Sequence, residues 1–164
     1  MSVSVTYASS ITVAETLETN IASMSAANRV LTHSLFNSSA SLVAGSSVPV
    51  TKVAAFEKAL AAGVGTIDLT ALTGSNGATV TFNGLKVQCA KFINKVGNTG
   101  AITIQEGAVN GYALGGAAFK WILQVGQELT LYGKEAAPDV AAADLAIDIA
   151  GTGTEVLQCI LVAG

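Results

Sequence analysis

Short runs of apolar and β-branched residues recur from residue 64 onward, about ten positions apart, with turn-forming residues between them. Asn76-Gly77 and Asn83-Gly84 are the strongest turn signals, because Asn and Gly adopt positive φ easily. Many short strands at this spacing predict a mainly β fold with little or no helix, an antiparallel β-sandwich of the jelly-roll or immunoglobulin-like kind. The predicted strands are 64–72, 78–82, 85–94, 101–106, 117–124, 127–132, 144–149 and 154–162.

The N-terminal part of the chain also alternates between apolar and polar residues. Val3 and Val5 alternate with Ser and Thr, and residues 11–18 do so with Ile11 and Val13 on one side. A period of two is typical of a half-buried strand. We therefore expect strands here, with Ile11 and Val13 pointing inward.

Residues 51–62 fit two structures. Val53, Phe56, Leu60 and Val64 have helical spacing, and the Ala, Glu and Lys between them favour a helix. The segment also ends at a glycine and leads directly into a predicted strand, as one arm of a β-hairpin would. Taken alone, the pattern slightly favours the helix.

A chain of 164 residues corresponds to about one domain. We expect residues 21–164 to form a single β-sandwich domain and residues 1–20 to form N-terminal strands that can act as an arm. Within the domain, residues 29–36 are strand-like, and the Ser-rich residues 37–47 predict a turn with a short strand.

Charged residues make up only 12% of the chain, whereas an average globular domain has roughly 25%. A surface with so little charge favours a homo-oligomer or a component of an assembly, and a weakly charged secreted monomer is the alternative. The net charge of −3 argues against nucleic-acid binding. No apolar run is long enough for a membrane span, and the first residues lack a signal-peptide pattern, so we expect folding in a cytoplasm.

Two similar stretches, Ile67–Leu69 and Ile147–Ile149, each place an aspartate between apolar residues. In a strand, Asp68 and Asp148 would point away from these apolar neighbours. A carboxylate on the solvent side of a sheet is the more common case, and nothing in the sequence supplies a paired acid. We therefore expect both residues to be structural rather than catalytic.

Each of these stretches is followed by a strand that contains a cysteine. Cys89 would share a face with Val87, and Cys159 with Leu157, so both thiols are expected to be buried. A nucleophilic cysteine needs a histidine or a helix N-terminus beside it, and His33 is the only histidine of the sequence. Neighbouring strands could bring Cys89 and Cys159 into contact, although such a disulfide would be incidental in a reducing cell.

The sequence contains no recognisable metal-binding or cofactor-binding motif. Asp139, Asp144 and Asp148 lie close in sequence but lack the spacing of a calcium loop. Gly63-Val64-Gly65 and Gly133-Lys134 do not continue into a nucleotide-binding pattern. The sequence therefore predicts no catalytic residues, no metal ligands and no cofactor, and we expect that the protein is not an enzyme.

Residues 107–116 form a long glycine-rich connection, which could either bind a ligand or let backbones pack closely. In the strand that follows, Phe119, Trp121 and Leu123 share one face, and Lys120 and Ile122 take the other. We expect these three residues to face the core, and exposure of Trp121 at a carbohydrate or partner surface is the alternative.

Residues 120–133, KWILQVGQELTLYG, resemble a recurring hairpin of virion structural proteins. Together with residues 62–72 and 156–162, they make about residues 50–164 similar in pattern to decoration (cement) and head-fibre proteins of tailed-phage capsids. The resemblance implies that residues 51–62 form a strand that makes a hairpin with 64–72. It transfers no catalytic residue.

The resemblance also implies a function. A protein of this kind would be made in the host cytoplasm and bind the exterior of an icosahedral capsid, bridging copies of the major capsid protein, commonly as a trimer. Residues 1–20 would then be the arm that contacts the capsid or a neighbouring subunit. The alternative is a trimeric fibre or spike domain that recognises a host surface glycan through loops near 107–116 and 134–143.

Overall fold

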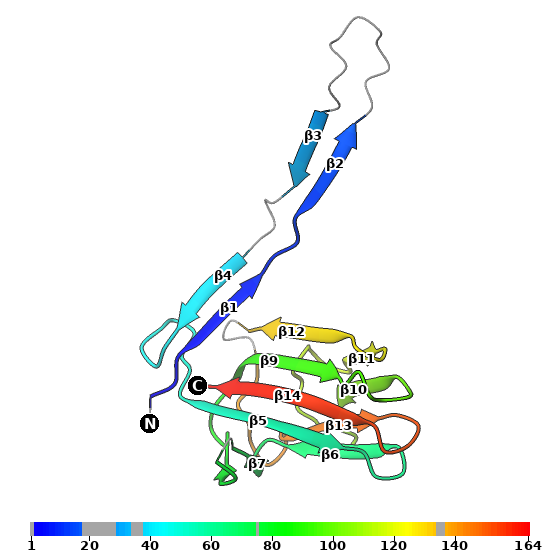
Figure 1. Cartoon of the computed structure of the whole chain (residues 1–164). Coiled ribbons are helices and arrows are strands. Elements are labelled where there is room, and N and C mark those ends of the chain that lie inside the picture. Colours follow the sequence, from blue (N-terminus) through cyan, green and yellow to red (C-terminus); the bar gives the residue numbers. More distant parts are fainter. Residues whose placement is uncertain (1, 18–28, 34–37, 75, 134–136) are drawn as a thin grey trace, which may run out of the picture. The chain divides into compact units, whose positions relative to one another are not determined.

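The computed structural model describes residues 2–17, 29–33, 38–74, 76–133 and 137–164 (Figure 1). These residues contain strands, turns and loops, and no helix is found among them. Within the described ranges there is accordingly no helix that could cross a membrane. The strands are β1 (Val5–Ser9), β2 (Val13–Leu17), β3 (Arg29–His33), β4 (Ser38–Leu42), β5 (Lys52–Ala59), β6 (Val64–Asp68), β7 (Leu72–Thr73), β8 (Thr79–Val80), β9 (Val87–Asn94), β10 (Ile102–Glu106), β11 (Lys120–Leu123), β12 (Glu128–Tyr132), β13 (Ala146–Ala150) and β14 (Val156–Ala163).

Two four-stranded antiparallel sheets form the sandwich. One sheet has the order β11-β10-β13-β6 and the other has the order β12-β9-β14-β5. The second half of the chain pairs with the first half in reverse, so that β5 pairs with β14, β6 with β13, β9 with β12, and β10 with β11. A long antiparallel ribbon rolled into two sheets is a jelly roll, which decides between the two sandwich types that the sequence predicted.

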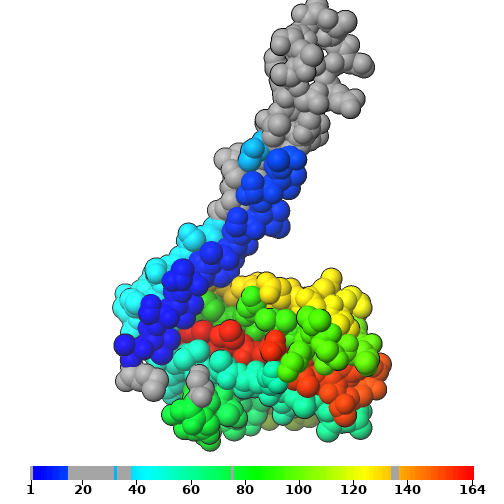
Figure 2. All heavy atoms as spheres, in the orientation of Figure 1, coloured from blue at the N-terminus to red at the C-terminus, as the bar shows by residue number. Residues whose placement is uncertain are grey.

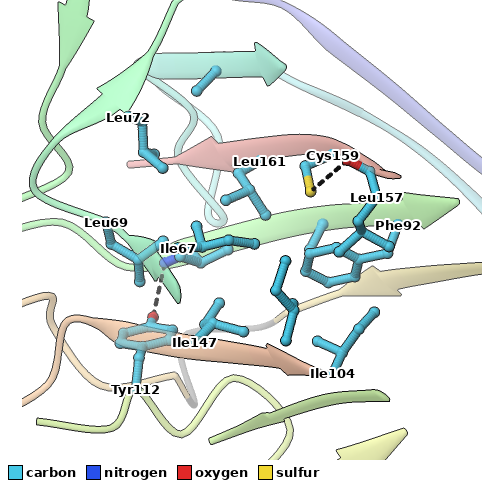
Figure 3. Packing of buried hydrophobic residues seen from close by; sticks show 14 of the residues in the cluster. Ile67, Leu69, Leu72, Phe92, Ile104, Tyr112, Ile147, Leu157, Cys159 and Leu161 are labelled. Carbon is cyan, nitrogen blue, oxygen red and sulfur yellow. Dashed lines mark hydrogen bonds between the residues drawn. The ribbon is translucent and has the colours of Figure 1, made fainter. Parts of the chain in front are cut away.

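The core lies between the two sheets (Figure 3). Ile67 of β6 lies opposite Ile147 of β13, and Ile104 of β10 lies opposite Ile149. These side chains are almost completely buried, as is Phe92 of the facing sheet. Strands occur within the predicted ranges from residue 64 onward, although a turn divides the range 64–72 into β6 and β7, and only Thr79–Val80 of the range 78–82 forms a strand. Alternation placed these core side chains inward.

The slight preference for a helix over residues 51–62 is wrong. Residues 52–59 form β5, which pairs with β14 along its whole length. Ala54 is completely buried and Ala55 is exposed, as expected for a strand. The strand that the resemblance implied is therefore correct, but its hairpin is reduced to one bridge between Ala61 and Val64, because β6 enters the opposite sheet.

Residues 5–41 form a compact unit of their own, separate from the unit made of residues 1–4 and 42–164. In this unit, which we call the arm, β1 pairs with β4 and β2 pairs with β3. The boundary between the two units lies at residues 41 and 42 rather than at residue 20, since β3 and β4 pair with β2 and β1 and lie in the same unit. The ends of the strands expected at residues 11–18 and 29–36, and the first residue of the turn expected at 37–47, lie outside the described residues.

The expected inward orientation of Ile11 and Val13 is also wrong. Ile11 is 76% exposed and Val13 is 51% exposed. The alternation did predict a strand, but in the described part of the arm β2 pairs only with β3, and a two-stranded sheet has no second layer of its own to cover one of its faces.

Candidate functional site

Asp68 and Asp148 both accept hydrogen bonds that hold local structure. Oδ1 of Asp68 accepts bonds from the backbone N–H and the hydroxyl of Thr70, at 2.8 and 2.6 Å. The two oxygens of Asp148 accept bonds from the Thr66 hydroxyl at 2.7 Å and from the Ala108 N–H at 2.9 Å. The expected orientation away from the flanking apolar residues is confirmed, and each carboxylate has a structural task.

The two similar stretches lie side by side in the fold. Ile67 pairs with Ile147, so β6 and β13 run antiparallel through these residues. Asp148 lies opposite Thr66 rather than Asp68. The structure thus brings the two sequence-predicted positions onto neighbouring strands without placing the carboxylates opposite one another.

Cys89 and Cys159 also lie on neighbouring strands, but they do not meet. Cys159 lies opposite Phe92, and Cys89 lies opposite Val162. Because Phe92 and Cys89 are three positions apart, their side chains point to opposite faces of the sheet. Both thiols are free and buried.

A β-bulge in β9 explains why one predicted face was wrong. The pairing moves from Cys89–Val162 to Val87–Ala163, which leaves Gln88 as an extra residue. Val87 therefore joins the core, while Cys89 lies on the other face. The expectation that Val87 and Cys89 share a face fails because a bulge reverses the alternation.

Both thiols are expected to be weak nucleophiles. Burial raises the pKa of the Cys159 thiol to about 12, and burial also raises the pKa of Cys89. A thiol with a raised pKa is a weak nucleophile at neutral pH. His33 belongs to β3 in the arm, where its backbone lies opposite Val13, and its side chain lies outside the described residues.

The three acidic residues considered for calcium do not form a cluster. The backbone of Asp139 forms an isolated β-bridge with the backbone of Lys86, the backbone of Asp144 closes a turn with that of Ala141, and Asp148 lies within β13. In the part of the chain that the structure describes, no group of three His, Cys, Asp or Glu residues could hold a metal ion.

The glycine-rich connection packs closely against the sandwich. A Cβ on Gly107 would lie 2.7 Å from the Cβ of Ala146, and a Cβ on Gly115 would lie 2.3 Å from the Trp121 ring. Neither position can accept a side chain without movement. Close packing, one of the two predicted roles of this segment, is therefore confirmed for these glycines.

The aromatic residues of this region belong to the core. Phe119 is buried, Trp121 is half-buried, and their ring centroids are 4.5 Å apart. Leu123 is buried and Ile122 is 56% exposed, so the predicted alternation is confirmed. The ring of Trp121 packs on Phe119 and Gly115, which leaves it poorly placed to stack on a glycan.

A cavity of about 330 Å³ beside the bulge could not be predicted from the sequence. Its apolar lining includes Val87, Ala90, Leu114 and Leu131, and Gln88 also borders it. Gln88 is almost completely buried, and its Oε1 has no hydrogen-bond partner. This Oε1 is the one buried side-chain nitrogen or oxygen atom among the described residues that lacks a partner, and a bulge leaves no sequence signal to find it.

The outer face of the sheet β12-β9-β14-β5 carries charges that neutralise one another. Lys91 and Glu128 form an ion pair at 2.9 Å, and Lys95 and Glu57 form another at 2.9 Å. Figure 2 shows atoms of β5, β14 and β9 next to one another on the surface of the sandwich. Lys95 and Gln158 hydrogen-bond to the Glu57 carboxylate, and they hold its pKa below the ordinary value.

A scan of the sequence against models of protein families finds no match. A search of curated protein sequences also finds no significant match.

Proposed function

We propose that this protein is a virion structural protein that binds the exterior of an icosahedral phage capsid and stabilises it by bridging copies of the major capsid protein. The arm carries this proposal. Each copy would add a modest contact, and the many copies on one shell would raise the free energy needed to take it apart.

The arm is suited to such a role because it has no core of its own among its described residues. An isolated two-stranded ribbon is marginally stable in water. Ile11 and Val13 expose large apolar side chains that would gain from being covered. An extended ribbon can reach a neighbouring subunit and bury these side chains against it.

The sandwich is consistent with the same role. Jelly rolls are common among virion proteins, and this is an argument from fold analogy alone. The low charge of the chain, 12%, leaves little desolvation penalty when its surface is buried in an assembly. Asp68 and Asp148 accept hydrogen bonds from the protein's own backbone and hydroxyl groups, which is consistent with a structural role.

Co-sedimentation with purified capsids tests the proposal. The full chain should pellet with the shells, and a variant lacking residues 5–41 should remain in the supernatant. Ile11→Asp together with Val13→Asp should weaken binding without removing the arm. The matched control is Val96→Asp, since Val96 is 80% exposed but lies in the sandwich unit. If the arm variants bind capsids as the full chain does, the arm is not the bridging element, and if the full chain itself does not bind, the proposed function is wrong.

A further inference from the structure

The outer face of the sheet β11-β10-β13-β6 is crossed by a row of small and apolar residues. Ile122 lies opposite Thr103, Thr103 lies opposite Ala150, and Ala150 lies opposite Val64. We call these four residues the outer row. Its two ends are 56% exposed at Ile122 and 63% exposed at Val64, on the two edge strands of the sheet.

The outer face of the other sheet differs. There, the exposed Ile160 is surrounded by Lys91, Glu57 and Gln158, and the charged groups are satisfied by partners on the same face. The outer row contains no charged residue, and the charged residues Lys120 and Asp148 lie in the next row of the same face. A strip without charges and with a large apolar side chain at each end is suited to burial.

The row is also self-complementary. A two-fold axis along the strand direction, between β10 and β13, would place β11 of one copy over β6 of the other. Ile122 of each copy would then cover Val64 of its partner copy, and the small residues Thr103 and Ala150 would let the two sheets approach.

Two residues of opposite charge, Lys120 and Asp68, lie beside the outer row on the two edge strands of the sheet. Lys120 lies on β11 in the row next to Ile122, and Asp68 lies near the end of β6. Within the described part of the chain, Lys120 makes no ion pair, and the Oδ2 atom of Asp68 accepts no hydrogen bond. The same two-fold axis would place Lys120 of one copy over Thr66 of the other, two residues before Asp68, so that the long Lys120 side chain can turn toward the Asp68 carboxylate, twice in each pair.

We propose that a second copy of this chain docks face to face on the outer row of the sheet β11-β10-β13-β6, as a two-fold symmetric pair. The contact is independent of the arm and of capsid binding. It differs from the trimer that the resemblance implies, since a two-fold contact closes on two copies.

The size of the face sets the strength of the pair. Four strands spaced about 4.8 Å apart and about five residues long cover roughly 19 by 17 Å. This footprint is smaller than the roughly 800 Å² per partner of a stable complex. The pair should therefore be weak in dilute solution and become populated where copies are concentrated, as in an assembly.

Sedimentation equilibrium of the full chain, from about 10 μM to about 1 mM, tests the proposal at the concentrations where a weak pair forms. We expect a monomer–dimer equilibrium. Ile122→Asp, or Val64→Asp, should weaken the dimer at least tenfold, because it buries an unpaired charge. Ile160→Asp on the other sheet is the matched control and should leave the equilibrium unchanged.

A charge exchange provides the second test. Lys120→Glu and Asp68→Lys should each weaken the dimer, and the two together should restore it, while a thermal melt checks that each variant is folded. A monomer throughout the concentration range, a trimer, or a dimer that Ile122→Asp and Ile160→Asp affect equally would overturn the proposal.

Discussion

The hydroxyl of Tyr112 accepts a hydrogen bond of 3.0 Å from the backbone N–H of Val87, drawn as a dashed line in Figure 3, and donates one of 2.9 Å to the carbonyl oxygen of Pro138. Tyr112 is completely buried, and burial raises its pKa to about 12. The side chain thus holds the start of the bulged strand β9 to the loop before Val140.

Replacing Tyr112 by Phe should lower the free energy of unfolding by about 1–3 kcal/mol, because the Val87 N–H and the Pro138 carbonyl would lose a partner in the interior. Urea unfolding followed by circular dichroism measures this change. Thr130→Val removes a hydroxyl from an exposed strand position and serves as the control, with an expected change near zero. Equal stability of Tyr112→Phe and the control would show that the bridge is not stabilising.

The thiols should resist alkylation in the native protein. Burial raises the pKa of Cys159 to about 12 and also raises that of Cys89, so at pH 8 both are protonated and shielded. We expect slow reaction with iodoacetamide in buffer and rapid reaction of both in urea, as followed by mass spectrometry. Fast native labelling of either cysteine would contradict the buried positions.

The pKa of Cys159 also predicts a loss of stability at high pH. The folded pKa lies above the ordinary thiol value of 9.0, so the protonated form is favoured in the folded state. The stabilisation is complete below about pH 9 and is lost as the pH rises toward 12. Cys159→Ala should show a smaller fall in unfolding free energy between pH 8 and 10.5 than the native chain, and an identical fall would count against this assignment.

Glu155 should support stability on the acid side. Its carboxylate accepts bonds from the Thr152 hydroxyl at 2.8 Å and the Gly153 N–H at 2.7 Å, and the Thr152 bond contributes most to lowering its pKa. Because the folded pKa is below the ordinary value of 4.5, the contribution is present above that pH and is lost as the pH falls through the folded pKa.

Glu155→Gln should therefore be less stable than the native chain at pH 7, and the difference should shrink as the pH falls below about 4.5. Thr152→Val removes the main donor and should give an intermediate result. Unfolding midpoints in urea at pH 7, 5, 4 and 3 measure the effect. A difference that does not change with pH would show that the carboxylate charge is not what stabilises the turn.

The bulge residue offers a stabilising change. The Oε1 atom of Gln88 is buried without a partner, and its Nε2 makes one long bond of 3.4 Å to the Gly164 carbonyl. Gln88→Met keeps the length of the side chain and removes the unpaired oxygen, so stability should stay equal or rise by up to about 1 kcal/mol. A loss of more than about 1 kcal/mol would indicate that the amide is satisfied in solution.

The strands from residue 64 onward could be predicted because each has its own alternation and its own turn. Residues 51–62 could not, because Ala, Lys and Glu favour a helix locally, and the strand forms only through its pairing with β14. The order of the strands could not be predicted either, because paired strands such as β5 and β14 are separated in sequence by all the other strands of the sandwich. Long-range pairing of this kind leaves no local pattern.

The candidate site positions were predicted better than their contacts. Alternation correctly placed Asp68 outside and Cys159 inside. It could not show that Asp148 holds the Ala108 N–H, nor that a bulge at Gln88 separates Val87 from Cys89. Alternation also does not show whether a second layer covers the sheet that a strand joins, which is why Ile11 and Val13 were expected to be buried.

The position and number of copies on the phage particle test the proposed function most directly. Electron cryomicroscopy of the intact particle should show this jelly roll at many symmetry-related positions on the outer surface of the capsid, with the arm touching a neighbouring capsid subunit. A few copies confined to one vertex or to the tail, or no copies on the shell, would contradict the proposal.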